Sequence, residues 1–479
     1  MVRRPPDRLR PPAPGPLRPF PFPPFVRQTL SSGLEVYAGR LAGVPLVSLA
    51  LLFPAGAQND PATGAGLATL TGALIDEGTR QRSALEIAAS VERLGGQLGS
   101  GADWDAGYIA AGLLAKDMPA AIELLAELAA EPSFPPAEVE RIRRLRLAEL
   151  LRRSHLPSAL ADDELLRAVY GGTVYAHPLL GTEPSVARLE RDRIVEFFER
   201  HYRVRGAALI AVGDLDPERF LAAAEDAFSP AAGRTGGPDD PPLPRHTPPA
   251  IALQPLPGIT VHVVDRPGAA QTELRLGHAG IPRTHADHTA TGVMNTILGG
   301  KFTSRINMNL RERHGYTYGA TSHFSQRLGP GPFTVSAAVA TESAGAAAHE
   351  VLAELRRIRE ALVEPEELEE TRSYILGVFP YHLQSIDDLA KRLEDLAIYG
   401  LPDDHYDRYF DRVNAVTRET ILDVARRHLD PDHLAIVAVG PGEVLQSQLE
   451  AFGPVVVHPP QPSAQLSEAA VAGAPSRAS

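Results

Sequence analysis

Residues 185–228, SVARLERDRIVEFFERHYRVRGAALIAVGDLDPERFLAAAEDAF, share one pattern with residues 411–452, DRVNAVTRETILDVARRHLDPDHLAIVAVGPGEVLQSQLEAF. Each stretch predicts an amphipathic helix, a short polar turn, an apolar strand, a glycine turn and another helix. The predicted strands, residues 207–212 and 434–439, give the clearest match, LIAVGD against IVAVGP. Repetition at this distance indicates two duplicated domains, because a solenoid repeats at a far shorter period.

The rest of the chain divides around this duplication. Its 479 residues are too many for one ordinary core and suit two domains. Composition predicts a Pro/Arg-rich arm at residues 1–25, a first domain at 26–228 and a Pro/Gly-rich linker at 229–250. A second domain at 251–456 and an Ala/Ser/Pro-rich, disordered tail at 457–479 complete the division.

Within the first half, strands and long helices alternate irregularly. We expect strands at residues 34–37 and Leu46–Phe53, helices at 65–74 and 84–94, a strand pair around 97–111, and amphipathic helices at Met118–Ala130 and 136–153. Hairpin-like strands followed by runs of helices predict an α+β fold, in which each domain has a mostly antiparallel sheet with helices packed on it.

Composition excludes several classes of function. The net charge is −12, which argues against a nucleic-acid partner, because phosphate binding requires a basic face. Absence of cysteine excludes disulfides, thiolate metal sites and a cysteine nucleophile. The first 25 residues lack the apolar run of a signal peptide, and the uncharged stretch 41–59 is broken by Pro45 and Pro54. We therefore expect a cytoplasmic protein without a membrane span, or a periplasmic one if the true start lies upstream.

Residues 66–79, GLATLTGALIDEGT, resemble the signature helix of the pitrilysin/insulinase family of metallopeptidases. In that family two histidines bind zinc and a glutamate between them activates water. The resemblance places Thr69 and Ala73 at the histidine positions, Gly72 at the glutamate position, and Glu149 at a later zinc-binding glutamate. A catalytic zinc needs three protein ligands, so we expect no metal and no cofactor in this chain. The competing interpretation of Glu149 is an exposed helix carboxylate paired with a neighbouring arginine.

Residues 94–108, LGGQLGSGADWDAGY, resemble the edge strand with which the family binds substrate. The resemblance makes Gly99, Ser100 and Ala102 candidates for peptide contact. An edge strand can bind an extended peptide through backbone hydrogen bonds alone. The alternative is an ordinary edge strand loosened by glycine. Trp104, the only tryptophan, is expected to be a packing residue.

Residues 298–341, LGGKFTSRINMNLRERHGYTYGATSHFSQRLGPGPFTVSAAVAT, resemble the carboxy-terminal domain of the bacterial family members. The family's Arg and Tyr, which reach the substrate in a partner's active site, match Arg311 and Tyr318. A guanidinium fork and a phenol suit a peptide carbonyl and its oxyanion. Lys301 departs from the family's pattern, where a third glycine is usual. The alternative is a surface arginine and a buried tyrosine.

One further stretch, THADHT, carries His285, Asp287 and His288 close together. These residues do not fall at i and i+4 on one helix face, so we expect the polar start of a helix and not a metal site.

Together these observations predict the non-catalytic subunit of a two-chain zinc metallopeptidase, similar to that of mitochondrial processing peptidase. The resemblance implies a partner chain with an intact His-x-x-Glu-His motif that carries the zinc, and a peptide substrate. One alternative is a peptide-binding or scaffold protein of the same fold. Another is an enzyme whose metal site has moved to His285 and His288.

Overall fold

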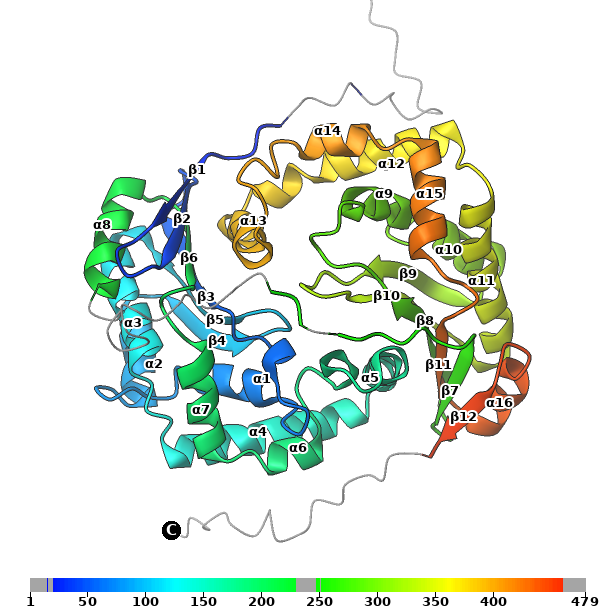
Figure 1. Ribbon diagram of the computed structural model, residues 1–479, viewed down its shortest axis with the longest axis horizontal. Coiled ribbons are helices and arrows are strands. Elements are labelled where there is room, and N and C mark those ends of the chain that lie inside the picture. The colour runs from blue at the N-terminus through cyan, green and yellow to red at the C-terminus, as the bar shows by residue number, and fades with distance from the viewer. Residues whose placement is uncertain (1–14, 16–19, 230–246, 250, 460–479) are drawn as a thin grey trace, which may run out of the picture.

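The computed structural model describes residues 15, 20–229, 247–249 and 251–459, and these form two sheet-plus-helix domains (Figure 1). The sheets, each six-stranded, are mostly antiparallel and carry helices, which confirms the α+β prediction. The predicted linker falls almost wholly outside the described residues. No helix in the described ranges is long and apolar enough to cross a membrane.

The sheet of the first domain has the strand order β1-β2-β6-β3-β5-β4. Strands β2 and β6 pair in parallel, and the other neighbours pair antiparallel. The strands are β1 Phe25–Thr29, β2 Glu35–Arg40, β3 Leu46–Phe53, β4 Gln97–Ala102, β5 Gly107–Leu114 and β6 Ala208–Gly213.

The sheet of the second domain has the order β12-β7-β11-β8-β10-β9, in which the last five positions repeat those of the first sheet. The outer positions differ, because β1 pairs antiparallel with β2, whereas β12 pairs in parallel with β7. The strands are β7 Thr260–Asp265, β8 Gln271–Ala279, β9 Thr317–Phe324, β10 Pro332–Ala340, β11 Ala435–Gly440 and β12 Val455–His458. The two repeated apolar segments become β6 and β11, which are buried along their whole length. The duplication read from the sequence is therefore present in the topology.

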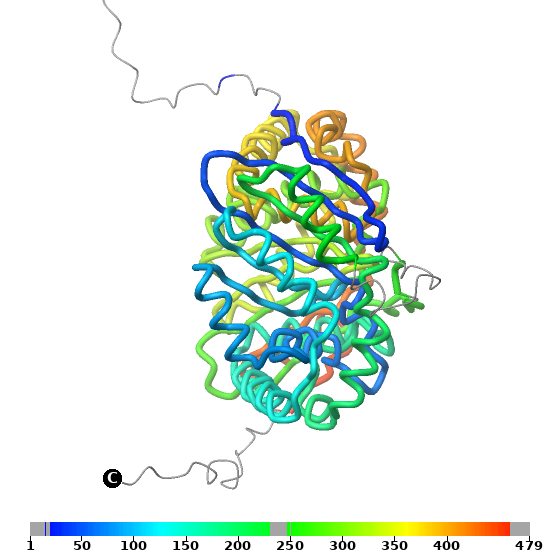
Figure 2. The backbone as a smooth tube through the Cα atoms, turned by 90° about the vertical axis from the view of Figure 1, so that its left-hand side faces the viewer, coloured from blue at the N-terminus to red at the C-terminus, as the bar shows by residue number. Residues whose placement is uncertain are grey.

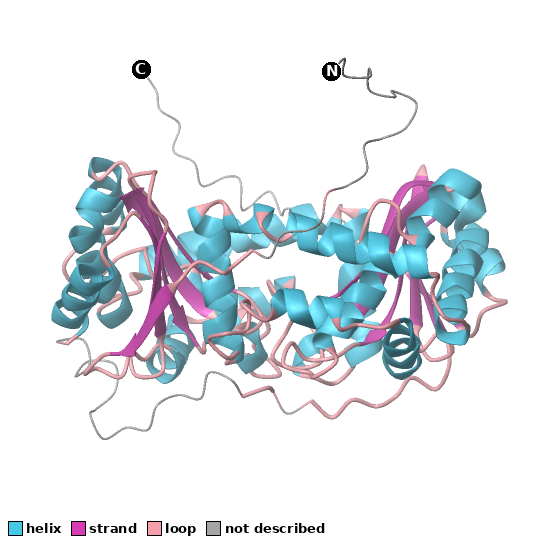
Figure 3. Ribbon diagram, turned by 90° about the horizontal axis from the view of Figure 1, so that it is seen from above, coloured by secondary structure: helices cyan, strands magenta, loops and turns pink. Residues whose placement is uncertain are grey.

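Helices cover both faces of each sheet (Figure 3). One face of the first sheet packs on α1, α2, α3, α7 and α8, and the matching face of the second sheet packs on α9, α11, α12, α15 and α16. The helices are α1 Leu67–Gly72, α2 Ala84–Arg93, α3 Met118–Ala130, α4 Pro136–Ser154, α5 Pro157–Tyr170, α6 Glu183–Ala187, α7 Arg191–His201, α8 Pro217–Phe228, α9 His288–Leu298, α10 Arg305–Asn307, α11 Ala344–Glu360, α12 Pro365–Val378, α13 Ile386–Tyr399, α14 Tyr409–Asn414, α15 Arg418–His428 and α16 Gly442–Leu449.

The domains exchange one helix each across their shared boundary. Helix α5 of the first domain packs on β8 and β11, and α13 of the second domain packs on β3 and β6 (Figure 1). The two domains lie one behind the other in Figure 2, with the first, coloured blue to green, in front. Each exchanged helix completes a separate apolar core with the other domain's sheet. The central strands are thus covered on both faces, which explains their continuous apolar sequence.

The structure also moves two of the boundaries expected from composition. Strand β12 runs to His458 and pairs with β7, so the second domain continues past residue 456 into the predicted tail. In the predicted amino-terminal arm, Phe22 is only 6% exposed and stacks on Tyr406 with 5.0 Å between ring centroids. Phe22 joins the fold because its ring is buried, whereas β12 joins through strand pairing, since Val456 and Val457 remain 49% and 42% exposed.

Candidate functional site

The first candidate site lies at helix α1, which contains Thr69 and Gly72 and ends just before Ala73. The Asp60 carboxylate accepts the backbone N–H groups of Gly66 and Ala68, both at 2.7 Å, and caps the helix. Burial raises the pKa of Asp60 to about 7, against the lowering effect of these hydrogen bonds. The sequence predicts a longer helix, residues 65–74, than the observed Leu67–Gly72.

A guanidinium group lies between Thr69 and Glu149. Arg146 of α4 is 8% exposed, and its Nη1 donates to Thr69 Oγ1 at 2.8 Å. Its Nε lies 3.6 Å from Glu149 Oε2, and the Glu149 side chain is 42% exposed. Burial lowers the pKa of Arg146, and the Glu149 carboxylate opposes that shift. The positive charge beside the degenerate motif therefore belongs to the protein itself.

Gly72 lies directly against the backbone of β4. A Cβ atom at this position would collide with the carbonyl of Gly101. Ser100 Oγ donates to the Gly72 carbonyl at 2.6 Å and to Asp76 Oδ1 at 2.9 Å, which fixes the contact between helix and strand. A glutamate side chain at this position would require α1 and β4 to move apart. Thr69, Gly72 and Ala73 offer none of the imidazole or carboxylate groups that usually bind zinc.

Strand β4, which contains Gly99, Ser100 and Ala102, lies at the edge of the first sheet. Its side toward β5 is paired, and its other side has no neighbouring strand in the described part of the chain. Trp104, just after the strand, packs against Arg327, whose guanidinium lies 4.0 Å from the ring centroid. The tryptophan is therefore part of the contact between the domains.

Arg311 and Tyr318 lie at the corresponding edge of the second sheet. A π-helical turn, Met308–Arg313, carries Arg311, and β9 carries Tyr318. Tyr318 is 89% exposed, in contrast to the buried tyrosine of the alternative interpretation. The Arg311 guanidinium lies 4.6 Å from the centroid of the Phe302 ring, which is itself 62% exposed. Arg311 is thus stacked on an exposed aromatic ring, and the edge strand that contacts its π-helical turn carries an exposed phenol.

Two family models match this chain: "Insulinase (Peptidase family M16)" over residues 40–183, and "Peptidase M16 inactive domain" over residues 188–375. The chain belongs to peptidase family M16. It is 25% identical to an uncharacterized zinc protease of Streptomyces coelicolor over 84% of this chain and 86% of that protein. An uncharacterized zinc protease of Mycobacterium bovis is 28% identical over 66% of this chain and 70% of that protein.

Solved structures agree with this M16 assignment. A peptidase M16 inactive domain from Pseudomonas fluorescens has a TM-score of 0.79 and 27% identity, with 87% of this chain and 98% of that chain covered. A protease from Helicobacter pylori has a TM-score of 0.81 over 88% of this chain and all of that chain, but at 19% identity it supports the fold alone.

In the M16 chain, THADHT leads into α9 as expected, and the histidines that lie close together differ from the pair of the alternative metal site, His285 and His288. His285 and Asp287 meet His428 of α15, whose Nε2 lies 2.7 Å from Asp287 Oδ2. Arg427 also pairs with Asp287, and the Asp287 N–H donates to His285 Nδ1 at 3.1 Å. The His288 side chain is not a member of this group, although its backbone N–H donates to the His285 carbonyl at 3.0 Å. Burial lowers the pKa of His288 to about 3. The pairing of His285 with His288 is therefore not what the fold produces.

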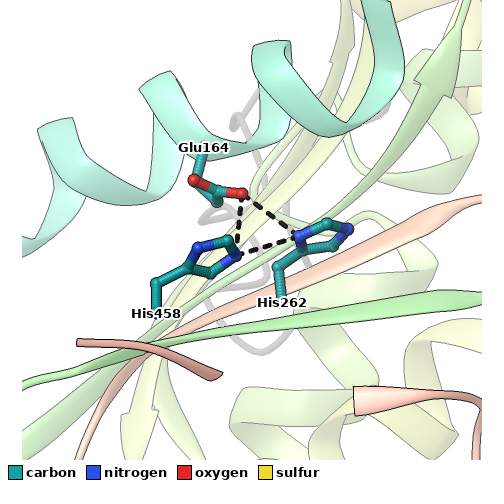
Figure 4. A group of neighbouring side chains, drawn as sticks. All are labelled: Glu164, His262 and His458. Carbon is teal, nitrogen blue, oxygen red and sulfur yellow. Dashed lines mark hydrogen bonds and ion pairs between the residues drawn. The ribbon is translucent and has the colours of Figure 1, made fainter. Parts of the chain in front are cut away.

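A second group joins residues that sequence analysis does not single out. Glu164 of α5, His262 of β7 and His458 of β12 meet at the boundary between the domains (Figure 4). Glu164 Oε1 lies 3.1 Å from His262 Nδ1 and 3.2 Å from His458 Nε2. The two ring nitrogens lie 3.2 Å apart. No sequence motif predicts this group, because its members are far apart in the sequence and come from both domains.

Proposed function

We propose that this M16 chain is the non-catalytic subunit of a two-chain metallopeptidase. A partner of the same family, with an intact His-x-x-Glu-His motif, supplies the zinc. This chain supplies Arg311 and Tyr318 to the peptide held in the partner's site. The observation that carries the proposal is the contrast between the two domains. In the first, Arg146 bonds Thr69 and a packed glycine replaces the motif's glutamate. In the second, Tyr318 is 89% exposed and Arg311 lies over the exposed Phe302 ring.

The chemistry of these two side chains suits an acyl-transfer transition state. A guanidinium offers several N–H donors in a fixed fork, and a phenol offers one O–H donor. Donors aimed at the oxygen that gains negative charge stabilise the transition state more than the ground state. The Arg311 guanidinium lies over the Phe302 ring. Among the described residues its ion pair is with Glu312, whose Oε1 lies 3.3 Å from Arg311 Nε, which leaves the two outer nitrogens for a substrate.

The test uses the chain co-expressed with a partner encoded nearby that has the intact motif. Arg311→Ala is expected to lower kcat/KM for an unfolded peptide by about 100-fold, by comparison with the loss of an oxyanion donor. Tyr318→Phe removes only the hydroxyl and is expected to cost about tenfold. Arg313→Ala is the matched control, because Arg313 is an exposed residue of the same π-helical turn. If Arg311→Ala behaves like Arg313→Ala, the proposed role is wrong.

The second candidate, a peptide-binding or scaffold protein, draws support from the unpaired edge of β4. Titration of the purified chain alone with the same unfolded peptide separates the two. Tight binding that Arg311→Ala leaves unchanged, with no activity on co-expression, favours the scaffold.

A further inference from the structure

Glu164, His262 and His458 lie so close together that no placement of hydrogen atoms makes all three contacts between them favourable. A neutral imidazole has one N–H, and an ionised carboxylate only accepts. Glu164 Oε2 pairs with Arg167 at 2.9 Å, which favours the ionised form and leaves Oε1 for the two rings. If both rings donate to Oε1, two N–H groups oppose each other across the 3.2 Å between the nitrogens. If only one ring nitrogen carries a hydrogen, the lone pair of the other faces the carboxylate.

A divalent cation at the centre makes all three contacts attractive. Zinc binds imidazole nitrogen and carboxylate oxygen at about 2.0–2.2 Å in a tetrahedron, which separates the ligand atoms by about 3.3–3.5 Å. The observed separations of 3.1, 3.2 and 3.2 Å lie just below that range. The ring planes are within 8° of parallel, so each imidazole needs a rotation about its own side-chain bonds to direct its lone pair at one ion.

The surroundings also suit a bound cation. The Glu164 side chain is 4% exposed, and the His262 and His458 side chains are 17% and 27% exposed. Arg167 fixes the second carboxylate oxygen, so Glu164 offers one oxygen in a set orientation. A cavity of about 800 Å³, lined in part by Glu164, His458 and His177, opens beside the group. That opening gives the ion an entry path and leaves a fourth position for water.

The other histidine group of the described structure, His285, Asp287 and His428, has hydrogen-bond and ion-pair partners of its own. Asp287 there already pairs with Arg427, and a backbone N–H donates to His285 Nδ1. Its charges and donors are thus satisfied without an ion, so it serves as an internal comparison.

We propose that Glu164, His262 and His458 bind one divalent transition-metal ion, of the zinc or cobalt class, that joins the two domains. The ligands come from α5 of the first domain and from β7 and β12 of the second, so the ion fastens the exchanged helix α5 to the sheet it covers (Figure 4). It also holds β12, the edge strand that ends the described chain, to its neighbour β7. This ion is separate from the zinc assigned to the partner chain, and its role here is to link domains.

The test begins with the purified chain alone, stripped with a chelator and titrated with Zn²⁺ or Co²⁺. One tightly bound equivalent is expected, with the visible spectrum of four-coordinate Co²⁺. His262→Gln, His458→Gln and Glu164→Gln are each expected to weaken binding by about 100-fold or more, because loss of a direct ligand exceeds loss of an outer partner. His428→Gln, in the other histidine group, is the matched control and retains the metal. Retention of the metal by both His262→Gln and His458→Gln overturns the proposal.

Two measurements on the native chain test the proposal even if a variant fails to fold. Crystals grown with Zn²⁺ or Co²⁺ are expected to show an anomalous-scattering peak within bonding distance of all three side chains. Zn²⁺ is also expected to raise the thermal midpoint of the chain, since an ion that binds only the folded state stabilises it. Absence of a peak at this position, or failure to bind either ion, overturns the proposal. Because no partner and no peptide are present, the outcome is independent of the proposed peptidase role.

Discussion

At the scale of single residues, the degenerate motif differs from the family's zinc motif both in side-chain chemistry and in the space around it. At Gly72 the backbone of β4 occupies the space that a side chain requires, and Ser100 fixes this contact with a hydrogen bond to the Gly72 carbonyl. At Thr69 the guanidinium of Arg146 supplies a positive charge. We expect that restoring histidine at Thr69 and Ala73 and glutamate at Gly72 does not by itself rebuild the family's motif, because a side chain at Gly72 requires helix and strand to move apart.

Gly72→Ala measures this contact. We expect the free energy of unfolding, from urea titration, to fall by about 1–3 kcal/mol, as for overpacked cores. Gly99→Ala is the matched control on β4, where a Cβ meets nothing within 4 Å, and it should change stability by less than about 0.5 kcal/mol. Equal effects of the two substitutions would show that α1 and β4 are not tightly packed.

At the scale of elements, the exchange of α5 and α13 decides how the domains are held together. Leu165 of α5 is 2% exposed and lies against Gly277 of β8, where a Cβ would come within 3.1 Å of Leu165 Cδ2. Asp162 of the same helix pairs with Arg275 of β8 at 2.7 Å. Each domain buries one face of its sheet with its own helices, but the other face is buried only by the helix of the other domain.

Leu165→Ala tests this dependence. The cavity is expected to lower the free energy of unfolding by about 2–5 kcal/mol, and the helix should detach before either sheet unfolds. Hydrogen exchange should then rise in α5 and in β8 together. Leu85→Ala, on α2 at 82% exposure, is the control and should leave both unchanged. Exchange confined to α5 would contradict the shared core.

At the scale of the whole molecule, buried histidines and buried carboxyl groups change the free energy of unfolding in opposite directions as the pH falls. Burial lowers the pKa of His201 to about 4 and of His405 to about 3, and it raises the pKa of Asp105 to about 7. A histidine with a lowered pKa stays neutral in the fold, so its contribution is lost as pH falls below its unfolded value of about 6.5. A carboxyl group with a raised pKa acts in the opposite direction, and its contribution is lost as pH rises from about 4 toward 7.

His288→Gln isolates one histidine contribution. Burial, with the nearby Arg283 and His405, lowers the pKa of His288 to about 3. Between pH 7.5 and pH 5 the unfolded chain gains a proton at this position and the folded chain does not, which costs the native protein up to about 2 kcal/mol. The variant should therefore lose less stability than the native chain over this interval in urea titrations. His349→Gln, at an exposed histidine, should follow the native chain. Identical pH dependence in all three proteins would refute the assignment.

Local sequence patterns were sufficient to predict much of the fold of this protein. Alternation and helical periodicity predicted the α+β class, and the repeated LIAVG and IVAVG segments predicted the duplication that appears as β6 and β11. The loss of metal ligands at Thr69, Gly72 and Ala73 was visible from residue identity alone. These inferences succeed because burial and ligand chemistry act on neighbouring residues or on single side chains. The roles of Arg311 and Tyr318 remain predictions.

Only the tertiary structure decided which distant residues meet. It placed Arg146 against Thr69, exchanged α5 and α13 between the domains, and carried β12 into the segment predicted to be a disordered tail. It also joined Glu164 to His262 and His458, and grouped His285 and Asp287 with His428 and not with His288. A sequence gives the apolar face of each element but not the partner that covers it, because many pairings bury similar area. Contacts between domains depend on that choice. The departure from the family's zinc motif is therefore visible in the sequence, whereas the three-residue group between the domains could not be foreseen.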